Sequence, residues 1–152
     1  MIQIVAVENH KNPAIDSLCQ EYIKRLQTIH PVSIQLLAAA KVPDPQQQKI
    51  KETESVLKLV KPGDTLILCD ERGKTTTSPA FSKWLETQLS QSRGKIIFAI
   101  GGAYGFTEQA IAQYPGIKLS DWVFPHHIAR LVLIEQIYRA FQIQRGTGYH
   151  HI

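Results

Sequence analysis

The sequence is poor in cysteine and contains no long apolar run. Cys19 and Cys69 are the two cysteines, too few for a disulfide framework, and both read as small buried apolar side chains. No apolar run approaches the roughly 20 residues that cross a bilayer. The amino terminus also lacks the charged start and apolar stretch of a signal peptide. We therefore expect a cytoplasmic protein without disulfides or a membrane segment.

The sequence also lacks a motif for binding nucleoside triphosphates and a large net charge. No glycine-rich loop carries the lysine and serine or threonine of a Walker motif, which argues against a nucleoside triphosphatase. The formal charge is only +4, so the composition favours a polyanionic partner weakly. The chain has 152 residues, of which 43% are hydrophobic and 20% charged, as is typical of a globular protein. We expect one domain spanning residues 1–152.

Strand-like and helix-like segments alternate along the chain. Apolar runs predict strands at 2–7, 32–36, 65–69 and 95–100, and helical spacing predicts helices at 12–26, 50–60, 78–89, 107–115 and 126–144. Segments 41–48 and 70–77 read as polar loops, and 118–124 reads as a strand or an extended loop. This order predicts an α/β fold with a mainly parallel sheet and helices on both faces.

In such sheets, ligands bind beyond the carboxyl ends of the strands. Three stretches satisfy that rule: the one from Asp70 onward, the one from Gly101 onward, and the segment leading to Pro125. Gly101, Gly102 and Gly105 in the second stretch allow close approach of a ligand to the backbone. A glycine turn after a strand is equally compatible with a purely structural role, so it does not identify a ligand alone.

Histidines stand at both ends of the last predicted helix. His126 and His127 precede it, and His150 and His151 follow it. A zinc site would require the tail to fold back and supply ligands at a compatible spacing. The simpler interpretation, which we favour, is that no metal is bound.

The last predicted helix is apolar around most of its circumference. A helix of this kind must be covered on all sides, and a subunit interface in a two-fold dimer would cover it. Arg130, Glu135 and Arg139 interrupt the apolar surface. Glu135 and Arg139 have the spacing of an i,i+4 ion pair at a solvated edge. Alternatively, Arg130 or Arg139 lies at a phosphate-binding rim, and the pattern does not decide between these interpretations.

Several blocks of the sequence resemble a known family. Residues 98–105 read FAIGGAYG, 119–126 read LSDWVFPH, 130–141 read RLVLIEQIYRAF and 148–150 read GYH, and the similarity extends to IVAV at 4–7 and EYIKR at 21–25. The chain thereby resembles the ribosomal RNA large subunit methyltransferase H family of the SPOUT superfamily. The resemblance implies a C-terminal trefoil knot, which general rules of chain topology would not lead one to expect.

The resemblance also implies a function. It predicts an S-adenosylmethionine-dependent methyltransferase that acts as a homodimer on N3 of a pseudouridine, in ribosomal RNA of the assembled ribosome. The implied cofactor-binding residues are Cys69, Asp70, Gly101, Gly102, Ser120, Asp121, Trp122, Val123, Phe124 and Pro125. The implied target-binding and catalytic residues are His126, Arg130, Tyr149 and His150. His150 could accept the N3 proton, because imidazole accepts protons near neutral pH, although the sequence does not identify the base.

Two positions depart from the family pattern, and two other functions remain open. Ala103 and Gly148 stand where the family usually has proline, which leaves both backbones freer. One alternative is a non-catalytic RNA-binding or ribosome-assembly factor that keeps the fold. The other is an α/β enzyme for a different nucleotide, in which Asp121 would bind a ribose about 20 residues after the glycine turn.

Overall fold

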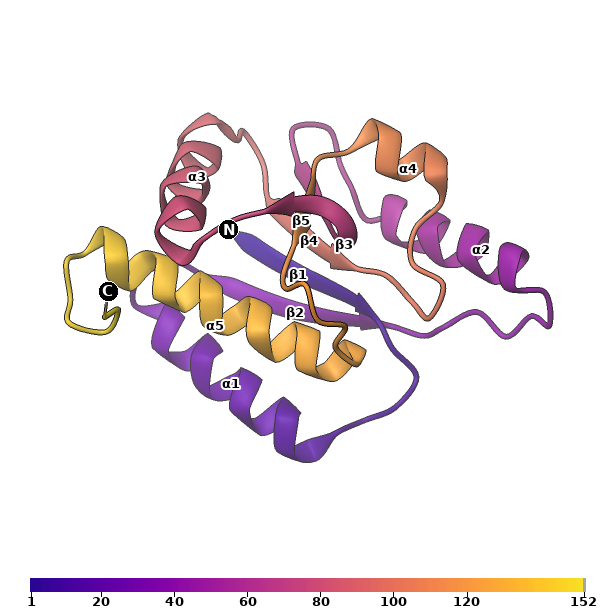
Figure 1. The fold of residues 1–152 in the computed structure, drawn as a ribbon, viewed down its shortest axis with the longest axis horizontal. Coiled ribbons are helices and arrows are strands. Elements are labelled where there is room, and N and C mark those ends of the chain that lie inside the picture. Colours follow the sequence, from indigo (N-terminus) through magenta and orange to yellow (C-terminus); the bar gives the residue numbers. More distant parts are fainter. Residues whose placement is uncertain (152) are drawn as a thin grey trace.

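The computed structural model describes residues 1–151 and shows strands and helices in alternation (Figure 1). The elements within this range are β1 (Ile2–Val7), α1 (Pro13–Gln27), β2 (Val32–Leu37), α2 (Pro45–Leu57), β3 (Thr65–Thr75), α3 (Ser78–Gln91), β4 (Ile96–Ile100), α4 (Glu108–Gln113), β5 (Gly116–Lys118) and α5 (His126–Gln144). No helix in this range is both long and apolar enough to span a membrane.

The strands form one five-stranded sheet in the order β2-β1-β4-β3-β5. Every pairing in it is parallel, as the alternation of strands and helices predicts. β4 lies at the centre, where Phe98 is in register with Ile4 of β1 and Ile67 of β3. All five residues of β4 are buried, as expected for a strand that is paired on both edges and covered on both faces.

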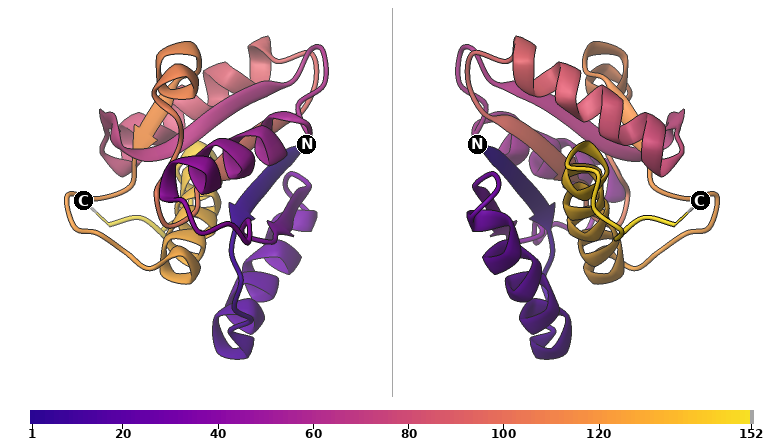
Figure 2. Two further views of the ribbon diagram at one scale, coloured as in Figure 1. Left: turned by 90° about the vertical axis from the view of Figure 1, so that its right-hand side faces the viewer. Right: turned by 90° about the vertical axis from the view of Figure 1, so that its left-hand side faces the viewer.

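Helices cover both faces of the sheet (Figure 2). Successive residues of β1 point to opposite faces: Ile4 packs in the cluster that includes α1, α3 and α5, and Val5 packs in the cluster that includes α2 and α4. The prediction of a parallel sheet with helices on both faces is therefore confirmed.

Capping side chains stand at the starts of α1, α2, α3 and α4. The side chains of Asn12, Asp44, Thr77 and Thr107 each accept a hydrogen bond from the backbone N–H three residues later, at the starts of α1 to α4. Proline follows the cap in the first turn of α1, α2 and α3, where its missing N–H costs no hydrogen bond.

Two predicted loops are wrong. The stretch expected to be a loop at 70–77 continues β3 as far as Thr75, because after a bulge Lys74 and Thr75 pair again with β5. The loop expected at 41–48 is shorter, because Asp44 caps α2 and the helix begins at Pro45. The segment at 118–124, expected to be a strand or an extended loop, is a loop beyond Lys118, where β5 ends.

Candidate functional site

The three stretches expected to bind a ligand line one cavity of about 550 Å³, although the first of them lies within β3, beyond its last pair with β4. The wall from β3 contributes Cys69 and Asp70, the turn after β4 contributes Gly101 to Gly105, and the segment after β5 leads along the cavity to α5. Of the residues expected at the cofactor, those lining the cavity are Cys69, Asp70, Gly101, Gly102, Ser120, Asp121, Trp122, Val123 and Phe124, and His126 joins them from α5. Pro125 does not line it and instead precedes the first turn of α5.

The glycine turn is closed on itself. The backbone N–H of Gly105 donates to the carbonyl of Gly102 at 3.0 Å, and Gly105 has a φ of 69°. Side chains rarely adopt this left-handed conformation, which is open to glycine. A Cβ on Gly101 would lie 3.1 Å from the backbone of Gly105, so the turn is too tight for a side chain there. The backbone itself is therefore the surface that a ligand would meet.

Asp70 and Cys69 differ in charge despite being neighbours. Burial works to raise the pKa of Asp70, but hydrogen bonds from the side chain and backbone of Arg72 outweigh it, so this pKa lies below its ordinary value. Burial, with a smaller effect of Asp70, raises the pKa of the Cys69 thiol far above its ordinary value. At neutral pH the wall therefore carries a paired carboxylate and an uncharged thiol, which is unsuited to nucleophilic chemistry.

The segment between β5 and α5 exposes most of its side chains. Trp122 is 81% exposed and Val123 is 86% exposed, although both line the cavity. The hydroxyl of Ser120 accepts a hydrogen bond from the backbone N–H of Trp122 at 3.0 Å, which shapes the start of the segment. Asp121 forms an ion pair with Lys118 at 2.6 Å. Large exposed apolar side chains beside a cavity are typical of a surface that a ligand or partner covers.

A second polar group lies on α5, where the tail folds back. Glu135 accepts hydrogen bonds from Arg139 at 2.6 and 3.0 Å and from the hydroxyl of Tyr149 at 3.1 Å. The guanidinium of Arg139 lies 4.8 Å from the centre of the Tyr149 ring, and its Nη1 lies 3.2 Å from Nδ1 of His150. The i,i+4 pair of Glu135 and Arg139 thus exists, and it holds the tail rather than facing solvent alone.

This arrangement determines which nitrogen of His150 carries a proton. Arginine can only donate hydrogen bonds, so Nδ1 of His150 must accept the bond from Arg139. In the neutral ring the hydrogen then resides on Nε2, which becomes a donor. In this arrangement the neutral ring of His150 presents Nε2–H as a donor on the side away from Arg139.

The residues expected to act on the target are not gathered in one place within a single chain. His126 lines the cavity, but Arg139, which contacts His150, lies about 20 Å further along the axis of α5. Arg130 is 2% exposed and forms ion pairs with Glu8 at 3.4 Å and Asp16 at 2.8 Å. In one chain, therefore, Arg130 ties α5 to the loop after β1 and to α1.

Sequence reasoning missed two residues near the cavity. Arg72 lines it and bonds to Asp70, but it stands in a stretch that reads as a loop. Glu52 is buried behind the glycine turn, and the sequence carries no signal for it, because an acidic residue in a polar helix is typical of an exposed position. Within residues 1–151 no group of three or more histidine, cysteine or acidic side chains could hold a metal ion.

Comparisons with known proteins agree on a family. A family model described as "Predicted SPOUT methyltransferase" matches residues 1–150. Ribosomal RNA large subunit methyltransferase H of Bacteroides fragilis is 39% identical over 95% of this chain and 92% of that protein. The protein of the same name from Flavobacterium psychrophilum is 37% identical over 99% of this chain and 98% of its own length. That from Parabacteroides distasonis is 46% identical over 69% of this chain and 68% of its own.

The surroundings of Tyr149 predict a raised pKa for its phenol. Burial raises the pKa of the Tyr149 phenol well above its usual range of about 10, with further contributions from Tyr22 and Glu135. Glu135→Gln removes one negative charge, so we expect the pKa of Tyr149 to fall while remaining above its usual range. Nuclear magnetic resonance of ring-labelled tyrosine, titrated with base, measures this pKa. Tyr149→Phe identifies the resonance, and exposed Glu54→Gln is the control; an unchanged pKa in Glu135→Gln would contradict the arrangement.

Proposed function

The chain belongs to the SPOUT methyltransferase family, and we propose that it uses S-adenosylmethionine to methylate N3 of a pseudouridine in large-subunit ribosomal RNA. The observation that carries the proposal is that segments of β3, of the turn after β4 and of the chain after β5 meet in one cavity. The relatives that match the chain over nearly its full length are named as ribosomal RNA methyltransferases. We propose that residues 1–152 act as one domain.

The cavity has the chemistry that this cofactor requires. A volume of about 550 Å³ is in the range of small-molecule sites. The bare backbone of Gly101 and Gly102 allows close approach, the uncharged Cys69 and Phe124 offer apolar contact, and Asp70 offers a carboxylate. When bound, the cofactor supplies a methyl group activated on a sulfonium. We assign the cofactor contacts to Cys69, Asp70, Gly101, Gly102 and the segment from Ser120 to Phe124, whereas Pro125, expected there from the resemblance, lies outside the cavity.

The family resemblance implies a trefoil knot, and we propose that the C-terminal part of this chain is threaded in that way. Knots are rare among protein folds. Supporting the proposal, the extension of β3 and the segment after β5 both border the same cavity, from which α5 departs. Threading would hold these segments together without a disulfide or a metal.

The reaction requires a nucleophile and the removal of a proton. A bond forms between N3 of the base and the methyl carbon, the carbon–sulfur bond breaks with its electron pair going to sulfur, and the N3 proton leaves to solvent or a base. Negative charge on the ring is spread onto its carbonyl oxygens as that proton departs. We propose that Nε2–H of His150 donates a hydrogen bond to such an oxygen and stabilises the charge. Tyr149 would contact the ring, with its hydroxyl held by Glu135.

His126 and Arg130 take different roles. His126 lines the cavity at the first turn of α5, so we assign it to the side of the target that faces the cofactor. Arg130 is enclosed by Glu8 and Asp16, so we assign it a positioning role in which it orients the first turns of α5. Removing either partner of a buried ion pair leaves the other charge uncompensated.

The separation of the two polar groups supports a dimer. In one chain the cavity lies at the first turn of α5, whereas the Tyr149–His150 tail contacts Arg139, about 20 Å further along the helix. Neither group alone therefore forms a complete site. Exposed apolar side chains lie at Leu18 on α1 and at Trp122 and Val123 beside the cavity. We propose a homodimer with a two-fold axis, in which the tail of one chain approaches the cavity of its partner. The ribosome would then be bound by a surface built from both chains.

Ribosomes from a strain that lacks the gene provide the substrate for the direct test. The purified chain with labelled S-adenosylmethionine should place one methyl group on one pseudouridine of large-subunit RNA, located by mass spectrometry of RNA fragments. Calorimetry with the cofactor distinguishes the alternatives, because a non-catalytic ribosome-assembly factor would bind ribosomes but not the cofactor. An enzyme for another nucleotide would bind that nucleotide and transfer no methyl group.

His150→Ala should lower kcat roughly 10²-fold, the range lost with one donor to a developing oxyanion, and leave the affinity for S-adenosylmethionine unchanged. His150→Gln, which keeps an N–H donor, should recover part of kcat. His151→Ala, at the exposed neighbouring position, is the control. If His150→Gln were as slow as His150→Ala, the donor role would be wrong and a base role favoured.

Mixed dimers test the composite site. Co-expression of His150→Ala with Gly102→Val, a variant whose side chain would collide with Glu52 and distort the glycine turn of the cavity, should restore about one quarter of wild-type activity, because about half of the dimers are mixed and each mixed dimer keeps one of its two sites. Each variant alone should be inactive or nearly so. Differently tagged subunits allow the mixed dimers to be isolated, and circular dichroism checks that both variants fold. Mixed dimers without activity would place the complete site within one chain.

A further inference from the structure

Glu52, on α2, is a carboxylate buried behind the glycine turn. It is 2% exposed, and its Oε1 accepts hydrogen bonds from the backbone N–H of Ala40 at 3.0 Å and from Nε2 of Gln48 at 2.9 Å. Its Oε2 is fully buried and has no hydrogen-bond partner among the described residues. No lysine, arginine or histidine of residues 1–151 forms an ion pair with it. A buried charge without a counter-charge is costly, so its presence calls for a compensating interaction.

The free oxygen of Glu52 points at the backbone of the cofactor cavity. A Cβ added to Gly102 would lie 2.1 Å from Oε2, so the carboxylate occupies the space next to this residue. Gly102 lines the cavity, so its backbone separates the carboxylate of Glu52 from a ligand bound there. The next residue on α2, Thr53, is also buried, and its hydroxyl accepts a hydrogen bond from the backbone N–H of Thr107 at 3.3 Å. Adjacent side chains of α2 thus lie against the glycine turn and against the start of α4 that follows it.

We propose that Glu52 is a positioning residue that supports the glycine turn and supplies the negative counter-charge for a cationic cofactor. The inference rests on the proposed cofactor. Because the carboxylate is shielded from solvent, its field in the cavity is weakly screened. The sulfonium charge of S-adenosylmethionine disappears when the methyl group leaves, whereas the rest of the cofactor is unchanged. Glu52 should therefore raise the affinity for S-adenosylmethionine relative to that for S-adenosylhomocysteine, and so assist the exchange of product for cofactor.

Calorimetry of both ligands separates this charge effect from a structural one. Glu52→Gln keeps the shape but removes the charge, so we expect affinity for S-adenosylmethionine to fall about tenfold and affinity for S-adenosylhomocysteine to change much less. Glu52→Asp keeps the charge, so the ratio of the two affinities should return towards that of wild type even if both affinities fall. Exposed Glu54→Gln is the control on the same helix, and thermal unfolding without ligand checks the fold.

The outcomes are distinct from those that test the function. Equal loss of both affinities in Glu52→Gln, or no loss of either, would overturn the charge role and leave the proposed methyltransferase intact. A wild-type chain that binds neither ligand would overturn the cofactor assignment and this inference with it.

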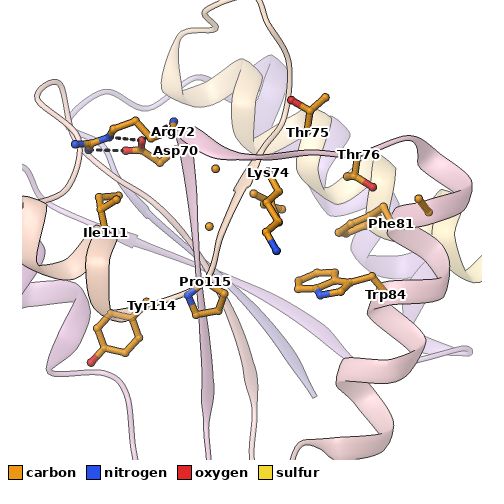
Figure 3. A pocket seen from close by; sticks show the side chains of 14 residues that line it. Asp70, Arg72, Lys74, Thr75, Thr76, Phe81, Trp84, Ile111, Tyr114 and Pro115 are labelled. Atoms are coloured by element: carbon orange, nitrogen blue, oxygen red, sulfur yellow. Dashed lines mark hydrogen bonds and ion pairs between the residues drawn. The ribbon is translucent and has the colours of Figure 1, made fainter.

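A second cavity, of about 560 Å³, lies where the extension of β3 meets α3, α4 and β5 (Figure 3). It shares only Asp70 and Arg72 with the cofactor cavity. Its apolar wall is built by Phe81 and Trp84, whose ring centres are 5.8 Å apart, and Pro115 lies across from them (Figure 3). The cavity is therefore a separate, partly aromatic recess beside the cofactor site.

Lys74 carries the unpaired positive charge of this recess. Its side chain points between Trp84 and Pro115 (Figure 3), and it forms no ion pair or side-chain hydrogen bond with the described residues. Arg72, the other cation of the lining, is bonded to Asp70 and to Glu108. An aromatic face beside a free ammonium is the chemistry that binds an unstacked base and its phosphate.

We infer that this recess binds one nucleotide of the RNA substrate other than the methylated one, with its base on Trp84 and its phosphate on Lys74. The inference rests on the proposed RNA substrate. The shared residues Asp70 and Arg72 place the recess directly next to the cofactor cavity, so an RNA strand at one could reach the other. A contact of this kind would add affinity for RNA, which a net charge of only +4 provides weakly.

Fluorescence tests the inference, because the chain has two tryptophans. In a Trp122→Phe background Trp84 is the remaining reporter, and a short oligouridylate should quench it. Lys74→Ala should weaken oligouridylate binding and reduce its salt dependence by roughly one phosphate contact, and it should raise KM for ribosomes while leaving cofactor affinity unchanged. Lys83→Ala, an exposed lysine beside Trp84 on α3, is the control.

Equal behaviour of Lys74→Ala and Lys83→Ala in an active enzyme would overturn the nucleotide site without affecting the proposed function. Quenching by polyglutamate but not by oligouridylate would also overturn it, in favour of an acidic peptide. Absence of methyl transfer by the wild-type chain would instead overturn the proposed function.

Discussion

Parallel pairing of β4 on both edges is the constraint on which the rest of the structure depends. β4 is buried along its length and pairs with β1 on one side and β3 on the other. Because these strands run in the same direction, the chain leaves β3, β4 and β5 at the same edge of the sheet. The cavity proposed to bind the cofactor follows from that geometry, since the segments after β4 and β5 form two walls and the part of β3 beyond its pairing with β4 forms the third. α5 then has one place to pack, across the face that α1 and α3 leave open.

The sheet and the cavity could be predicted from the sequence because both depend on local signals. Apolar runs identify the strands, and alternation with helices implies their parallel direction. The positions of Asp70, Gly101 and Ser120 at the cavity then follow from strand ends alone. The group on α5 could not be predicted in this way. Its assembly depends on a chain reversal at Gly146, which has a φ of 65°, and on contacts from the tail to a helix turn many residues earlier.

Two parts of the fold were predicted wrongly because tertiary contacts outweigh the local pattern. Residues 71–75 are polar and carry no strand periodicity, yet β3 runs through them, and Lys74 and Thr75 pair with β5 after a bulge. The apolar residues Ile50, Leu57 and Val60 predict the helix expected at 50–60, whereas the most buried residues of α2 are Glu52, Thr53 and Val56. A polar side chain at a buried position disguises the face it lies on. Such positions are where functional demands compete with the hydrophobic pattern.

The contact between Glu52 and Gly102 has a consequence for how relatives of this chain can diverge. The two positions share one volume, so a methyl group at 102 would displace the carboxylate from its bonds to Ala40 and Gln48. A shorter residue at 52 would accommodate that methyl group but would leave a void while 102 is still glycine. Substitutions at either position alone are therefore disfavoured, and their effects are not additive. Positions 52 and 102 should vary together during evolution, or not at all.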